Sequence, residues 1–226
     1  MKKRKRYVKW LLMGLLVLAC AVVWPLLWRD LDKMHCNRGV KFYEMKNYPK
    51  AEACFRVAAK SGIAEACFNL GMMYDNGIGV EKDYVEAVSW YRLAAEKKFP
   101  AAQCCLGIMY YLGKGVERDV KQAIDWLQAA ADQEWVDAFY TFGQVYIRED
   151  GVGRDDKKAE YWFRKAAEKG HVNAQYNLGI MYRYGLGVKR DTLEARTWFK
   201  QAADAGDEKA RKELEEDWAR DKEEGE

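Results

Sequence analysis

Side chains that could carry out chemistry are few in this chain of 226 residues, and none forms a recognisable catalytic group. The two histidines, His35 and His171, lie far apart, so no metal cluster and no pairing of a histidine with a nucleophile is predicted. His171 is predicted to be a surface residue. The strings GIG, GKG, GVG and GLG follow predicted helices instead of strands, which is typical of turns and not of phosphate-binding loops. We therefore predict no enzyme activity, no cofactor and no metal ion.

The six cysteines are the remaining reactive groups. One of them, Cys20, lies in an apolar N-terminal segment, which leaves an odd number: Cys36, Cys54, Cys67, Cys104 and Cys105. Several stand where other copies of a repeat carry an aromatic residue, which favours small buried hydrophobic side chains. In an oxidising compartment, however, Cys54 and Cys67 could meet across the turn at Gly62 and form a disulfide. Both possibilities stay open at the level of the sequence.

These residues belong to a repeat of 36 residues. Glycines recur at this spacing without a gap, at Gly71, Gly107, Gly143 and Gly179. Around the first of them, Ala66, Leu70 and Tyr74 share one face of a helix, and Ala87 and Trp90 begin a second series. The pattern predicts an all-α fold, an α-solenoid of helix-turn-helix repeats in which each helix pair buries its apolar face against its neighbours.

Turn and capping residues mark the start of each second helix. Aspartates recur at the N-cap position, at Asp83, Asp119, Asp155 and Asp191. Three are followed by a capping-box Glu or Gln, whereas the third has Lys158. In that repeat Glu149 also replaces the capping glycine, so the turn after Ile147 is predicted to differ in shape. The mid-helix glycines predict a close approach of the partner helix, with the repeat tryptophan filling the gap.

The full pattern is A-x-A-x-(Y/F)-x-L-G-x-x-Y, then G-x-G-V, an aspartate, and A-x-x-W-(Y/F)-x-x-A-A. It resembles the Sel-one-like repeat, a branch of the tetratricopeptide superfamily, from about Ala64 to Asp207, and the loop at Glu149 is its clearest departure. The resemblance implies an adaptor that binds a protein or peptide partner. Cysteine-rich secreted relatives have been linked to penicillin binding, but they carry a regular cysteine pair in each repeat, which this chain lacks. An envelope enzyme of that kind is the alternative to an interaction scaffold.

The N-terminal segment that ends at Trp28 predicts a membrane anchor. Six basic residues lie in the first ten positions, and the stretch from Trp10 to Trp28 carries no charge. A helix of that length spans about 28 Å, close to the hydrocarbon thickness of a bilayer. The positive-inside rule places the N-terminus in the cytoplasm and the repeats outside, as in a single-pass protein of a bacterial inner membrane. A cleaved signal peptide, or a lipoprotein signal with Cys20 acylated, are the alternatives.

Spacing divides the chain further. The predicted segments are 1–9 (basic cytoplasmic N-terminus), 10–28 (transmembrane anchor), 31–62 (tetratricopeptide-like first repeat, with Asn47 as N-cap of its second helix), 64–99, 100–135, 136–171 and 172–207 (repeats two to five), and 208–226 (C-terminal capping helix and tail). Beyond Trp28 there are 32 basic and 35 acidic side chains, so the basic pI does not indicate a nucleic-acid-binding protein.

The related architecture also predicts where a partner binds, because its first helices line a concave groove. The positions that the spacing assigns to this groove are Asn37, Val40, Asn69, Met72, Asp75, Asn76, Cys105, Ile108, Tyr111, Leu112, Thr141, Gln144, Ile147, Arg148, Asn177, Ile180, Arg183 and Tyr184. The candidate partner-binding residues among them are Asn69, Met72, Tyr111, Asn177, Arg183 and Tyr184. Such a groove would suit an extended peptide or a helix with one acidic group. Alternatively, Tyr111 and Tyr184 pack the loops, and binding uses the outer face or the ends.

Overall fold

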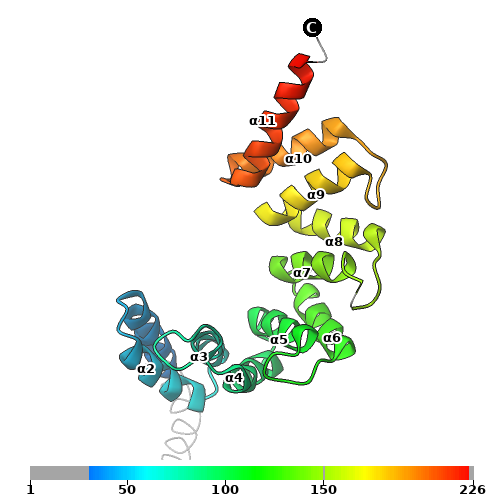
Figure 1. Cartoon of the computed structure of the whole chain (residues 1–226). Coiled ribbons are helices and arrows are strands. Elements are labelled where there is room, and N and C mark those ends of the chain that lie inside the picture. The colour runs from blue at the N-terminus through cyan, green and yellow to red at the C-terminus, as the bar shows by residue number, and fades with distance from the viewer. Residues whose placement is uncertain (1–30, 150, 224–226) are drawn as a thin grey trace, which may run out of the picture. The chain divides into compact units, whose positions relative to one another are not determined.

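A computed structural model describes residues 31–149 and 151–223, and all regular structure in these ranges is α-helical. The chain divides after Ala94 into two compact units. The first unit holds the helical residues 31–44, then α2 (Tyr48–Lys60), α3 (Ala64–Asn76) and α4 (Tyr84–Glu96), which ends two residues past the division. The second holds α5 (Pro100–Leu112), α6 (Val120–Ala131), α7 (Val136–Tyr146), α8 (Asp156–Glu168), α9 (Val172–Tyr184), α10 (Thr192–Asp204) and α11 (Glu208–Glu223). The predicted fold of repeating helix pairs is confirmed, and the pairs α7/α8 and α9/α10 are seen side by side in Figure 1.

Aspartates begin the second helices as predicted. The side chain of Asp119 accepts a hydrogen bond from the backbone N–H of Gln122 at 2.9 Å, and Asp83, Asp155 and Asp191 make the equivalent bond. Each bond satisfies a backbone donor that the first turn of a helix leaves without a partner. Asn47 is the N-cap residue of α2, but its side chain makes no capping hydrogen bond.

The capping-box glutamates have a different role from the one predicted. The backbone N–H of Asp83 donates to the carbonyl of Tyr74 at 3.0 Å, so it has a partner in the preceding helix. Glu86 instead accepts a hydrogen bond from the indole N–H of Trp90 at 2.9 Å, and Glu194 does the same for Trp198 at 3.0 Å. A tryptophan N–H in a partly buried setting needs such an acceptor.

Aromatic packing against the mid-helix glycines corrects another prediction. A Cβ on Gly143 would lie 2.4 Å from the ring of Phe163, and the same close approach joins Gly39 to Phe55, Gly71 to Tyr91, Gly107 to Leu127 and Gly179 to Phe199. The residue after the tryptophan, or after Cys54 in the first repeat, fills the gap, and it is 0–1 % exposed in each repeat. Trp90, Trp126 and Trp162 are only partly buried, whereas Trp198 is 8 % exposed. Adjacent positions point about 100° apart around a helix, so only one of the two can face the glycine.

Helix α7 ends early, as the odd loop in its sequence predicts. The helices α3, α5 and α9 run five residues past their mid-helix glycine, to Asn76, Leu112 and Tyr184, and end on a left-handed glycine. Helix α7 stops three residues after Gly143, at Tyr146, and Ile147 closes it in a right-handed conformation. The C-terminal end of α7 therefore differs from the ends of the equivalent first helices α3, α5 and α9.

The ends of the chain complete the description. In α11, Ala210 is fully buried against the α9/α10 pair and Leu214 packs beside it, as expected of a capping helix. Among the described helices, none is long and apolar enough to cross a membrane. The predicted anchor at 10–28 and Cys20 lie outside the described residues.

Candidate functional site

Two pockets lie at predicted groove positions, one in each unit. The pocket of the first unit has a volume of about 70 Å³ and is lined by Val40, Tyr43, Phe55, Asn69 and Met72. Its side chains come from the helical residues 31–44, α2 and α3. Two of the six candidate residues, Asn69 and Met72, are thus brought together beside a buried phenylalanine ring.

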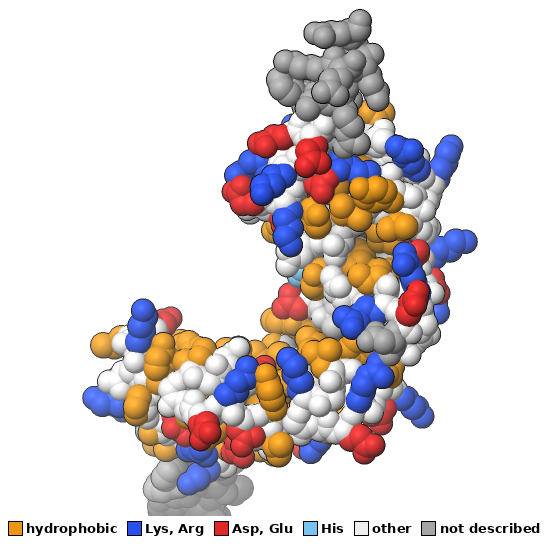
Figure 2. All heavy atoms as spheres, in the orientation of Figure 1, with side chains coloured by type: hydrophobic (Ala, Val, Ile, Leu, Met, Phe, Trp, Pro, Cys, Tyr) orange, Lys and Arg blue, Asp and Glu red, His pale blue; other side chains and the backbone are white. Residues whose placement is uncertain are grey.

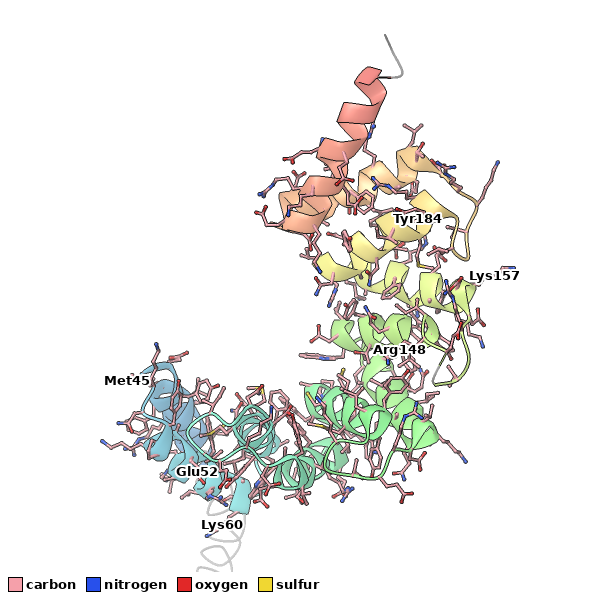
Figure 3. All side chains as sticks on the ribbon, in the orientation of Figure 1. Met45, Glu52, Lys60, Arg148, Lys157 and Tyr184 are labelled. Atoms are coloured by element: carbon pink, nitrogen blue, oxygen red, sulfur yellow. The ribbon has the colours of Figure 1, made fainter. Side chains whose placement is uncertain are left out.

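The pocket of the second unit is larger, at about 220 Å³. Its lining comes from α8, α9 and the loops that follow α7 and α9: Ile147, Arg154, Asp156, Phe163, Asn177, Ile180, Met181 and Leu186. Arg154 and Asp156 form a two-bond ion pair, Nε to Oδ1 at 2.8 Å and Nη2 to Oδ2 at 3.2 Å. Figure 3 shows Arg148, Lys157 and Tyr184 at the same loop end of these helices, and Figure 2 shows hydrophobic surface over α8 and α9. The pocket is therefore apolar inside and charged at its edge.

The two pockets are equivalent positions of the repeat. Phe55, Asn69 and Met72 of the first correspond to Phe163, Asn177 and Ile180 of the second, each three repeats later in the sequence. Counted from the mid-helix glycine, Tyr43 corresponds to Ile147. A second shared feature accompanies each pocket, because Arg56 pairs with Glu52 and reaches Tyr74, and the equivalent residues Arg164, Glu160 and Tyr182 do the same. The contacts between α2 and α3 and those between α8 and α9 are thus made by equivalent side chains.

The other three candidate residues lie in different surroundings. Tyr111 is 6 % exposed and packs on Gly151 of the next loop. Arg183 is 8 % exposed, forms an ion pair with Glu213 of α11 and lies over the ring of Phe199 at 4.6 Å. Tyr184 is 65 % exposed. Of the three, only Tyr184 has most of its surface exposed to solvent, where a partner could contact it.

His171 is not the surface residue predicted. It caps α9, where its Nδ1 accepts a hydrogen bond from the N–H of Ala174 at 3.2 Å, and its ring stacks on Tyr140 with centroids 4.3 Å apart. Burial lowers the pKa of the imidazole. The negative charge of Asp137, whose carboxylate lies 3.6 Å from Nε2, raises that pKa by a smaller amount. Ile63, Phe99 and Trp135 occupy this position elsewhere, a pattern from which its packing could have been inferred.

Cysteines in the described part of the chain are all free thiols, so Cys54 and Cys67 form no disulfide. Burial raises the pKa of Cys36 to about 11 and that of Cys104 to about 12. Such thiols stay protonated at neutral pH and are poor nucleophiles. Cys36, Cys67 and Cys104 are buried, as predicted for small hydrophobic residues. Within the described residues, no group of acidic, histidine and cysteine side chains could hold a metal ion.

Sequence reasoning missed several residues of the larger pocket. Arg154, Asp156, Phe163 and Leu186 lie outside the first-helix positions from which the groove was predicted. The mismatched loop at Glu149 was the available signal. Where that loop is regular, the residue equivalent to Arg154 is Arg118, whose Nε donates to the carbonyl of Tyr111 near the helix end.

Helix pairs of this kind, repeated with the same glycine contact in each repeat, define a helical-repeat protein of the tetratricopeptide-like class. The profile of the Sel1 repeat matches residues 36–63, 64–99, 100–134, 140–171 and 172–207, so the chain belongs to the Sel1 repeat family. A Sel1 repeat protein from Oxalobacter formigenes is similar, with 32 % identity, a TM-score of 0.76, and coverage of 82 % of this chain and 76 % of that one.

Further similar proteins differ more in size. The protective antigen c5321 of uropathogenic Escherichia coli has 35 % identity and a TM-score of 0.73, over 81 % of this chain and 40 % of that one. The HcpE protein of Helicobacter pylori J99, named as a candidate beta-lactamase, is 37 % identical over 57 residues, 25 % of this chain and 16 % of that protein. The ubiquitin-ligase component HRD3 of Candida glabrata is 48 % identical over 42 residues, 19 % of this chain and 5 % of that protein. The chain spans at most a fifth of these two curated relatives.

Proposed function

We propose that this protein is an interaction scaffold that binds a protein partner through the first-helix positions of its repeats. The observation that carries the proposal is the pair of equivalent apolar pockets at predicted groove positions, each with a half-buried asparagine. An apolar pocket with one amide can bury a side chain and hydrogen-bond the peptide beside it. Membership of the Sel1 repeat family supports a binding role.

The proposal includes a membrane anchor at residues 10–28 with the repeats outside the cytoplasm. It is supported by the uncharged stretch from Trp10 to Trp28 and by the basic residues before it. A reporter active only after export, fused to the C-terminus, is expected to be active in cells. Activity from a cytoplasmic reporter alone would contradict this topology.

Crosslinking in intact cells followed by purification of the full chain tests the scaffold role. A variant with alanine at Asn69, Met72, Asn177 and Ile180 removes one amide and one apolar contact from each pocket. It is expected to lose the crosslinked partner while keeping its helical circular dichroism. The control has alanine at Val85 and Leu193, which are 64 % and 75 % exposed. Equal capture by both variants would place binding on another surface.

A further inference from the structure

We propose that the larger pocket, at Ile147 and Asn177, is the anchoring site for one bulky apolar side chain of an extended peptide segment of the partner, and that residue 147 decides whether the pocket is open. The proposal rests on the scaffold function above. It deepens that function by naming the part of a partner that is bound and the residue that selects it.

The two equivalent pockets differ at this position and at the start of the second helix, where Tyr48 of the first unit corresponds to Asp156 of the second. Tyr43 lines the pocket of about 70 Å³ and stacks edge-on against Tyr48 at 5.5 Å, whereas Ile147 lines the pocket of about 220 Å³. The phenylalanine and asparagine beside them are the same in both. A smaller side chain at the end of a shortened helix therefore leaves space that the tyrosine occupies in the first unit.

Equivalent positions in the other repeats are already engaged. Tyr111 packs on Gly151, Arg183 pairs with Glu213, and the carboxylate of Asp75 accepts a hydrogen bond from the Tyr91 hydroxyl at 3.3 Å. Ile147 instead faces a cavity. The early end of α7 and the small side chain of Ile147 both enlarge the pocket, because a longer helix or a larger side chain would fill the same space.

The lining of the pocket indicates its occupant. A volume of about 220 Å³ is below the range of about 300–1,000 Å³ typical of small-molecule sites, but it can hold a side chain. Phe163, Ile180 and Leu186 make the interior apolar. Arg154 and Asp156 neutralise each other, so a charged side chain would gain little there.

Asn177 indicates how the backbone of the occupant lies. Its side chain is half-buried at the pocket and makes no hydrogen bond within residues 31–149 and 151–223. An amide carries both a donor and an acceptor, which matches one peptide group of an extended segment. One bound peptide could thus place its backbone at Asn177 and its apolar side chain in the pocket.

The test uses the full 226-residue chain and a phage-displayed library of random ten-residue peptides. Selected peptides are expected to share a Leu, Met, Phe or Trp at one position. Ile147→Tyr, which copies the first unit, should weaken their binding by about tenfold or more, because burial of a large apolar side chain is worth at least that factor. The control Leu193→Tyr adds the same ring at an exposed position of the second helix α10 in the same unit, outside the groove positions and the pocket lining, and should leave binding unchanged.

Methyl resonances give a second measurement that needs no variant. Those of Ile147 and Ile180 should shift when a selected peptide is added, and that of Ile63 should not. The proposal is overturned if no peptide is selected, if Ile147→Tyr binds as tightly as the unaltered chain, or if the shifts lie elsewhere. The scaffold function survives each of these results as long as the crosslinked partner depends on the first-helix residues, so the two proposals can fail separately.

Discussion

Replacing Gly143 by alanine should destabilise the second unit, although the same change in an ordinary helix interior stabilises by about 1 kcal/mol. The added Cβ would lie 2.4 Å from Cδ1 and Cε1 of Phe163, a ring that is 1 % exposed and cannot swing into solvent. Overpacking of a core typically costs about 1–3 kcal/mol. The net effect expected from these two opposing terms is a loss of up to about 2 kcal/mol.

A double-mutant cycle makes the reasoning refutable. Phe163→Ala alone should cost about 3–5 kcal/mol, as for other buried phenylalanines. In that background the ring is gone, so Gly143→Ala should stabilise by about 1 kcal/mol through helix propensity alone. The resulting coupling of about 1–3 kcal/mol is in the range seen for residues in contact.

Hydrogen exchange of the α7 and α8 amides is the appropriate assay, because helical repeats need not unfold in one step. Urea unfolding followed by circular dichroism gives the global comparison. If Gly143→Ala stabilises the unaltered chain as much as it stabilises the Phe163→Ala variant, the glycine is not required for close packing, and the explanation of the glycine series is wrong.

Three further predictions concern other sites. The pKa of His171 is lowered on folding, so the unfolded chain binds the proton more readily than the folded chain. The contribution of His171 to the free energy of unfolding should therefore be constant well above pH 6.5 and should fall as the pH drops below that value. His171→Phe, which introduces the residue found at Phe99, should remove this dependence in urea titrations. Arg183→Met leaves Glu213 partly buried without its partner and should release α11. The loss should be below the about 3–5 kcal/mol of a fully buried pair, because Glu213 is part-exposed. The double variant with Glu213→Leu should recover much of this loss in thermal melts. Nitrocefin should not be hydrolysed by the purified chain, and saturable turnover abolished by a cysteine or serine substitution would favour the enzyme alternative.

Several parts of this structure could be predicted from the sequence. The 36-residue period, the helix pairs, the aspartate caps and the unusual turn after Ile147 all follow from short-range rules, because a cap or a turn depends on residues within one or two turns of it. Asn69 and Asn177 were also assigned correctly to their first helices, since their positions follow from counting along a helix.

Other parts depended on contacts between helices that are distant in sequence. The tryptophan series looked like the core, yet the following residue faces the glycine, because the rotation of one helix relative to its partner cannot be read from the period alone. Arg183 looked like a binding residue until α11 brought Glu213 to it. The larger pocket likewise depends on distant contacts, since side chains from α8, α9 and the loops that follow α7 and α9 must all be placed before a space between them exists. The sequence by itself therefore determined the repeat and its local caps, and only the tertiary structure decided which side chains are buried, which are paired and where a partner's side chain could enter.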